Sequence, residues 1–242
     1  MSTRLGIGIS TKLDSFSAGK EAARNALYQL ARPEVDIAIV FISPIFEQQI
    51  VIKAVRSITG YAPLVGCSST GTIASSGVFR NSVAVCTISS DSSRFSCAVG
   101  HNISKNPRLA GSQAARLSSN LKNVTKQVYI MLSDCLSGNM ADILRGAQEI
   151  RGTSFPIIGG AAIDDLGFQK SYQYFNNNIY SDSVVGILMG GDIRIGIGNA
   201  HGWQPIGKPH KITKARLNVI KEIDGRRASE LYEEYLDKSY DE

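Results

Sequence analysis

Apolar residues along this chain follow two patterns, one typical of helices and one of buried strands. Between residues 18 and 30 they recur every three or four positions, which predicts a helix with one apolar face. Residues 36–42, after the opening Asp36, and residues 128–132 are unbroken apolar runs of strand length, as expected for strands covered on both faces. A helical apolar stripe follows each run and ends at a glycine, Gly60 or Gly152. A short apolar strand comes next in both places, so the pattern predicts two β-α-β units with parallel strands.

The same order of segments occurs twice. Residues 18–24 read AGKEAAR and residues 110–116 read AGSQAAR, while 63–69 (PLVGCSS) matches 156–162 (PIIGGAA). Two copies of this length indicate a duplicated supersecondary unit rather than a solenoid. After each β-α-β unit we expect a hairpin, formed by strands 82–88 and 94–100 and by strands 184–189 and 193–198.

The predicted fold is therefore α/β, with internally duplicated β-α-β units extended by hairpins. We expect mixed sheets with helices outside, and two halves, 5–101 and 103–201, related by a pseudo-two-fold axis. Stacking of two sheets is favoured over one merged sheet. From His201 onward charged residues become common, so we expect one domain at 1–200 and another at 201–242. The second contains a hairpin over 210–223 and a helix over 228–238, too little to form its own core.

Composition narrows the classes of function. The 242 residues carry a net charge of +5 without runs of like charge or interleaved aromatic and basic residues, which argues against nucleic-acid binding. No apolar stretch approaches the ~18 residues of a membrane span, and the one at 5–9 is too short for a signal peptide. We therefore expect a cytoplasmic protein with no membrane partner, in which the four cysteines are reduced.

Candidate chemistry lies where the parallel strands end, because ligands bind at the carboxyl ends of such strands. Small and polar residues occupy these positions, and their backbone amides and hydroxyls can hold a small polar molecule. The candidate ligand-binding residues are Cys67, Ser68, Ser69, Thr70, Ser133, Asp134, Gly160, Ala161 and Asp164. The alternative is that these small residues only permit a tight turn and close sheet packing.

Other chemistries find less support in the sequence. Cys67 or Ser68 can serve as the nucleophile of a hydrolase if a histidine, His101 or His201, lies nearby, but no acidic residue that would orient the histidine is identifiable. The three histidines are dispersed and lack metal-ligand spacing. We therefore expect no catalytic residues, no metal and no cofactor.

The chain carries seven short motifs in a fixed order: GIGIS at 6–10, AGKEAA at 18–23, VF at 40–41, GCSSTG at 66–71, NSV at 81–83, GGAAID at 159–164 and HGW at 201–203. Together these motifs resemble the FIST sensory family, named for F-box and intracellular signal transduction proteins. The family pattern leads us to expect glycine and aspartate after Gly160, where this chain has Ala161 and, further on, Asp164.

The resemblance implies a FIST N-terminal-like domain over 1–200 and the truncated beginning of a C-terminal-like domain over 201–242. It implies a non-catalytic sensory domain that binds a small polar metabolite, such as an amino acid, and passes its occupancy to a signalling protein partner. Two alternatives remain open, a hydrolase using Cys67 or Ser68 and a structural interaction domain.

Overall fold

A computed structural model describes residues 2–116, 121, 123–165, 167–205 and 207–237. The chain divides into two compact units, Met1–Ile195 and Gly196–Glu242. None of the helices in the described ranges is both long and apolar enough to pass through a membrane. The second unit consists of strands β13 (Ile212–Arg216), β14 (Val219–Ile223) and β15 (Arg226–Arg227), followed by helix α5 (Ala228–Asp237). Its hairpin and helix confirm the elements predicted there.

The first unit contains two large sheets with two helices each. The first sheet has the order β1 (Thr3–Ser10), β6 (Val83–Ser90), β2 (Ile37–Ile42), β3 (Leu64–Ser68), β10 (Gln173–Phe175) and β11 (Asn178–Tyr180). The second has the order β7 (Ser93–His101), β12 (Ser183–Gly191), β8 (Lys126–Asp134) and β9 (Ile157–Ala162). The helices are α1 (Ser15–Leu30), α2 (Gln48–Thr59), α3 (Pro107–Ala114) and α4 (Met140–Arg151). A separate hairpin is formed by β4 (Gly71–Ala74) and β5 (Gly77–Arg80).

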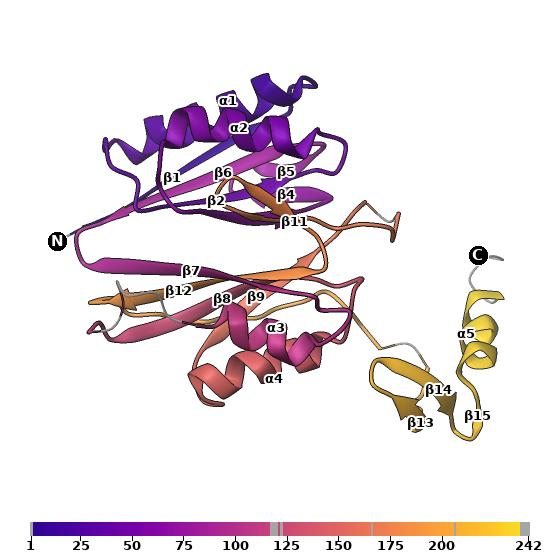
Figure 1. Ribbon diagram of the computed structural model, residues 1–242. Coiled ribbons are helices and arrows are strands. Elements are labelled where there is room, and N and C mark those ends of the chain that lie inside the picture. Colours follow the sequence, from indigo (N-terminus) through magenta and orange to yellow (C-terminus); the bar gives the residue numbers. More distant parts are fainter. Residues whose placement is uncertain (1, 117–120, 122, 166, 206, 238–242) are drawn as a thin grey trace. The chain divides into compact units, whose positions relative to one another are not determined.

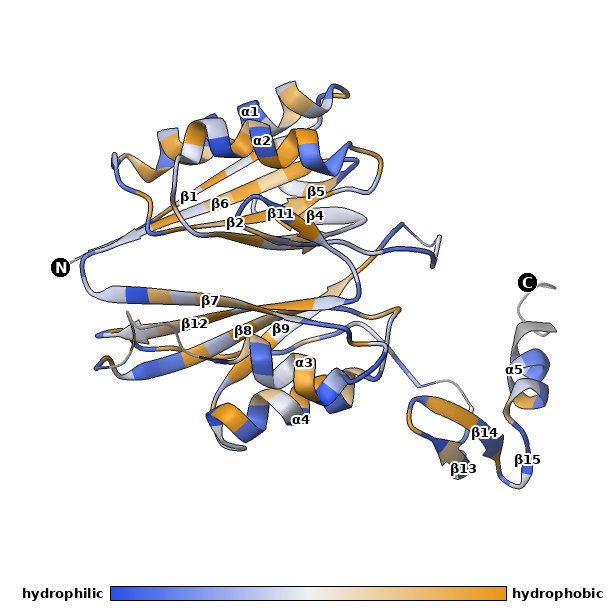
Figure 2. Ribbon diagram, viewed as in Figure 1, coloured by the Kyte–Doolittle hydropathy of each residue, from blue (hydrophilic) through white to orange (hydrophobic). Residues whose placement is uncertain are grey.

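The two sheets lie face to face and the helices cover their outer faces, as Figure 1 shows. The side chains of β2 explain the arrangement, since alternate residues point to opposite faces of a strand. Ala38, Val40 and Ile42 pack under α1 and α2. Ile37 and Phe41 instead join clusters shared with the second sheet. Figure 2 shows the resulting apolar colouring along the inner strands. A strand with two covered faces therefore reads as a continuous apolar run.

Both predicted β-α-β units are confirmed. Strand β2 runs parallel to β3 with α2 between them, and β8 runs parallel to β9 with α4 between them. The neighbour order β1-β6-β2-β3 is matched by β7-β12-β8-β9, and each set contains its helices and a hairpin in the same chain order. The two halves thus share one topology, while their origin by duplication stays a prediction.

The predicted hairpin of 82–88 with 94–100 is wrong. Strand β6 already pairs with β1 on one side and β2 on the other, so it has no free edge for β7. Strand β7 instead opens the second sheet, where it pairs with β12. The second predicted hairpin is wrong for the same reason, because β12 lies between β7 and β8, and residues 193–198 form no strand. The second half consequently begins near Ser93 rather than at residue 103.

Close packing within the sheets depends on glycine at equivalent positions of β3 and β9. A Cβ atom on Gly66 would lie 1.8 Å from the Val40 carbonyl oxygen, and one on Gly159 would lie 1.8 Å from the Met131 carbonyl oxygen. Gly160, one residue further along β9, has no atom within 4 Å of such a Cβ. An added methyl group should therefore destabilise the fold at Gly66 and be tolerated at Gly160.

We expect Gly66→Ala to lower the free energy of unfolding by about 1–3 kcal/mol, because the backbone of β2 must move to admit the methyl group. Gly160→Ala is the matched control and should change stability by less than about 0.5 kcal/mol. Urea denaturation followed by circular dichroism measures both. Equal effects of the two substitutions would contradict the packing described for β3.

The junction between the two units should be the first site of proteolysis. The described residues from 193 to 211 contain no helix or strand, so their backbone is available to a protease. A broad-specificity protease should cut there before elsewhere and leave a stable fragment of the first unit. Mass spectrometry of the early fragments tests this, and first cuts within β1–β12 would refute it.

Candidate functional site

The carboxyl ends of β3 and β9 come together through Ser68. Its hydroxyl donates a hydrogen bond to the Ile163 carbonyl oxygen at 2.8 Å and accepts one from the Tyr172 N–H at 3.0 Å. The Ile163 N–H in turn donates to the Ser68 carbonyl oxygen at 3.3 Å. Ser68 is buried, so the two loops that the sequence nominates meet at a closed, fully hydrogen-bonded contact.

Cys67 lies on the inner face of the first sheet. It is buried against Leu132, Ala162 and Val185 of the second sheet, and this burial raises the pKa of its thiol to about 12. The thiol is therefore protonated at neutral pH. A protonated, enclosed sulfur is a poor nucleophile, and the Ser68 hydroxyl is already committed as donor and acceptor.

The histidines considered as partners of a nucleophile have other surroundings. His101 Nδ1 lies 3.1 Å from the Ser183 hydroxyl, and the imidazole packs against the Tyr180 ring with centroids 4.8 Å apart. His201 belongs to the second unit. Within the described ranges, no group of three or more His, Cys, Asp and Glu side chains could hold a metal ion.

Asp134 and Ser133 are both buried at the end of β8. The Asp134 carboxylate accepts hydrogen bonds from the Leu136 N–H at 2.8 Å, the Ser137 hydroxyl at 2.7 Å and the Asp182 N–H at 3.0 Å. Ser43, at the end of β2, accepts one from the Ser82 N–H at 2.9 Å in the same way. These two side chains tie the end of a central strand to the turn that precedes β12 or β6.

Asp164 holds its own loop in shape. Its carboxylate accepts hydrogen bonds from the backbone N–H groups of Lys170 at 2.9 Å, Gln169 at 2.5 Å and Phe168 at 2.8 Å. These hydrogen bonds, that of Lys170 foremost, lower the pKa of the Asp164 carboxyl below its ordinary value. Gly160 and Ala161 are exposed on β9. Ser69 uses its hydroxyl to donate to the Gly71 carbonyl oxygen at 2.6 Å.

A hollow of about 510 Å³ opens beside this contact, between the β4–β5 hairpin and the loop after β9. Its lining consists of Thr70, Gly71, Ile73, Val78, Arg80, Asn81, Ile163 and Asp165. It contains one cationic and one anionic side chain, Arg80 and Asp165, both exposed, together with the Thr70 hydroxyl and an apolar wall. Among the candidates nominated from sequence, only Thr70 lines it.

Sequence reasoning missed Arg80 because it did not predict the β4–β5 hairpin, and it did not select Asp165, which follows β9 in a loop. The available signal was a pair of short segments, 71–74 and 77–80, on either side of two serines. Asp165 has a left-handed backbone with φ of 59°. Aspartate tolerates this conformation better than most residues, so a turn at this position was also readable.

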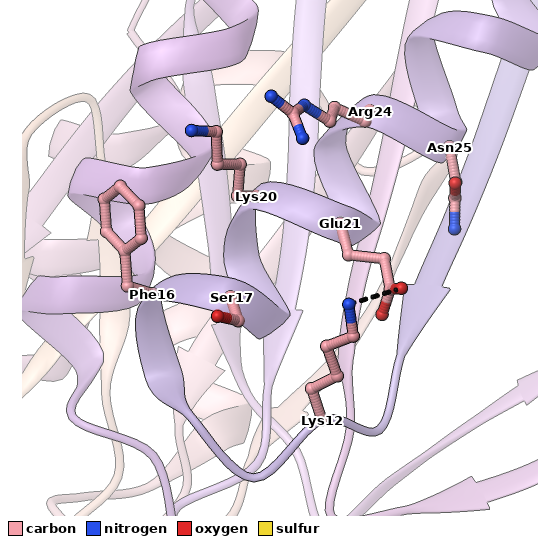
Figure 3. A pocket seen from close by; sticks show the side chains of 7 residues that line it. All are labelled: Lys12, Phe16, Ser17, Lys20, Glu21, Arg24 and Asn25. Atoms are coloured by element: carbon pink, nitrogen blue, oxygen red, sulfur yellow. Dashed lines mark ion pairs between the residues drawn. The ribbon is translucent and has the colours of Figure 1, made fainter.

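A second hollow, of about 430 Å³, runs along α1 (Figure 3). Lys12 and Glu21 point toward each other there and form an ion pair at 3.0 Å, while the Lys20 ammonium lies 5.4 Å from the centre of the Phe16 ring. Glu21 also accepts a hydrogen bond from the Ser10 hydroxyl at 2.5 Å. The only anionic group of this hollow is thus already paired, which makes the hollow beside β4–β5 the better candidate site.

Comparison with known proteins places the chain in a family. It is 25% identical over 237 residues to "Uncharacterized protein MJ1623" of Methanocaldococcus jannaschii, covering 92% of this chain and 44% of that protein. It is 25% identical over 227 residues to "Uncharacterized protein Rv0628c" of Mycobacterium tuberculosis, covering 92% of this chain and 57% of that protein. The chain thus spans about half the length of these relatives.

Among solved structures, the cyanuric acid hydrolase of A. caulinodans is similar with a TM-score of 0.40 and 9% identity, over 79% of this chain and 71% of that one. This likeness is too distant to inform either the fold or the chemistry. The FIST N domain, in contrast, matches residues 36–226. That match includes both β-α-β units, the hollow and the start of the second unit. The chain therefore belongs to the FIST N domain family.

Proposed function

We propose that this chain is a sensory domain that binds a small zwitterionic metabolite, such as a free amino acid, in the hollow beside the β4–β5 hairpin. The observation that carries the proposal is that one hollow is lined by two side chains of opposite charge, Arg80 on β5 and Asp165 in the loop after β9. A guanidinium recognises a carboxylate and a carboxylate recognises an ammonium group. An α-amino acid presents both groups on neighbouring atoms.

The remaining lining residues suit the rest of such a ligand. The Thr70 hydroxyl can donate to or accept from a polar group, and Ile73, Val78 and Ile163 provide an apolar wall for a side chain. No ion pair within the described residues engages Arg80 or Asp165. Each charge-assisted contact with a ligand would contribute on the order of 1.5–3 kcal/mol.

The proposed role is non-catalytic. Support comes from the two possible nucleophiles, since the Cys67 thiol is buried with a pKa of about 12 and the Ser68 hydroxyl bridges Ile163 and Tyr172. Neither group lines the hollow. A ligand there would contact segments from both halves of the first unit, so its occupancy would bias how the hairpin sits against the loop after β9. A signalling partner that distinguishes the two arrangements would complete the sensor.

A thermal-shift screen of the common L-amino acids tests the ligand class. A ligand that binds only the folded chain should add about 2.7 kcal/mol of stability at a hundredfold excess over its dissociation constant. Arg80→Gln and Asp165→Asn should each weaken binding by about ten- to hundredfold, which corresponds to the loss of one charge-assisted contact.

Arg116→Gln is the matched control, because Arg116 is an exposed arginine outside the hollow. It should leave the thermal shift unchanged, and the ligand should be recovered chemically intact. A screen with no hit on the folded protein would favour the structural interaction domain. Turnover of a ligand that is abolished by Cys67→Ala would favour the hydrolase.

Substitution of Asp134 should lower the stability of the fold, whereas substitution of Asp165 should weaken ligand binding. Because its buried carboxylate accepts three hydrogen bonds, Asp134→Ala should lower the free energy of unfolding by about 1–3 kcal/mol in the absence of any ligand. Asp165→Asn, at an exposed position and with a side chain that tolerates the same left-handed backbone, should change it by less than about 0.5 kcal/mol. Chemical denaturation of the two variants separates the roles. Equal stabilities would show that Asp134 is not the structural tie described above.

A further inference from the structure

The open edge of β9 is an unused strand-pairing surface. In the first sheet the equivalent edge, that of β3, is covered by β10 in the register Gln173 with Cys67, Tyr174 with Gly66 and Phe175 with Val65. Strand β9 pairs with β8 and with no other strand in the described ranges. Its sequence, IIGGAA, carries neither the charges nor the proline with which proteins protect an exposed edge.

The β4–β5 hairpin is suited to pair with this edge. Its register, Thr72 with Phe79, Ile73 with Val78 and Ala74 with Gly77, repeats that of β10–β11, where Gln173 pairs with Tyr180, Tyr174 with Ile179 and Phe175 with Asn178. Both hairpins have two-residue turns, and both precede the last strand of their half. Each therefore holds the same place in its half of the chain.

The two hairpins differ sharply in burial. Tyr174 is fully buried and Ile179 packs beside it in the cluster under α1 and α2. The corresponding pair in β4–β5, Ile73 and Val78, is 86% and 72% exposed. The exposed apolar pair of the hairpin and the unpaired edge of β9 are both unfavourable in water. Docking the hairpin onto β9 would bury the apolar pair and satisfy the backbone groups of the edge.

We infer that the β4–β5 hairpin docks onto β9 in the register that pairs Thr72 with Gly160, Ile73 with Gly159 and Ala74 with Ile158. This register is obtained by carrying the β3–β10 pairing over to the equivalent residues of the other half. Ile73 would then lie on the α4 side of the sheet, where Ile157 and Met140 are only partly buried. The hairpin is within reach, because only residues 69 and 70 separate it from Ser68, which is hydrogen-bonded to Ile163 just beyond β9.

The backbone of β9 is oriented for this pairing. The Tyr129 N–H donates to the Pro156 carbonyl oxygen at 3.0 Å. Because alternate residues of a parallel strand face its neighbour, the N–H groups of Gly159 and Ala161 point away from β8. In the docked arrangement they would donate to the carbonyl oxygens of Ile73 and Gly71. Docking would also close the hollow. A role for docking in regulating ligand binding therefore rests on the proposed function.

Disulfide trapping tests the register without any ligand. Directly paired residues of antiparallel strands have Cα atoms ~4.5–5.5 Å apart, within the range that a disulfide spans. The variant Thr72→Cys/Gly160→Cys should therefore become almost completely bridged under mild oxidation. In the control Thr72→Cys/Ile158→Cys, the second cysteine lies about 7 Å further along β9, and no bridge should form. Both variants carry Cys135→Ser, which removes a partly exposed thiol.

Absence of a bridge in the first variant, or equal bridging in both, would overturn the inference. Amide hydrogen exchange of the unmodified protein provides a second readout that needs no substitution. Gly159 and Ala161 should exchange at least ~10-fold more slowly than in an unfolded chain, whereas unprotected exchange would also overturn docking. Bridging of the first variant, together with no thermal-shift hit for the unmodified protein, would refute the proposed function alone. A thermal-shift hit without bridging would refute docking alone.

Discussion

The structure of the first unit depends on one apolar layer between its two sheets. Residues such as Ile37 and Val65 from the first sheet meet Phe95 and Ile187 from the second, and Phe175 contributes to both clusters of the layer. Each central strand must then be apolar on both faces, one toward this layer and one toward its helices. The layer also fixes the two β-α-β units relative to each other, so that their carboxyl ends meet at the Ser68–Ile163 contact.

Because this apolar layer excludes water, the polar residues near the carboxyl ends of the strands fall into a buried group and an exposed group. Ser68, Ser43 and Asp134 lie where water is excluded, so their polar atoms need hydrogen-bond partners within the protein, which are mainly backbone groups, and they hold the loops together. Arg80 and Asp165 lie outside the layer, line the hollow and are exposed to water. The same sheet ends therefore carry rigid inner ties and adaptable outer groups, a division that suits a binding site.

Much of the fold was predictable from the sequence, because the layer leaves a direct trace in it. The apolar runs at 36–42 and 128–132, followed by helical stripes and glycines, located both β-α-β units. Strand β7 was misassigned because adjacent strands with a short polar connection read as a hairpin, and only the sheet itself reveals that both edges of β6 are taken. The meeting of the two loops was predictable. Which side chains face outward was not, since buried Asp134 and exposed Asp165 look alike in sequence.

The central proposal is that this FIST N domain chain binds a small ligand in the hollow beside β4–β5. Two-dimensional amide NMR of the isotope-labelled protein, titrated with the common L-amino acids, tests this most directly because it reports backbone N–H groups throughout the chain at once. The account predicts that an amino acid shifts signals clustered at Thr70, Gly71, Ile163 and Asp165. Shifts confined to the α1 hollow around Lys20 and Arg24, or to residues 196–237, would contradict it.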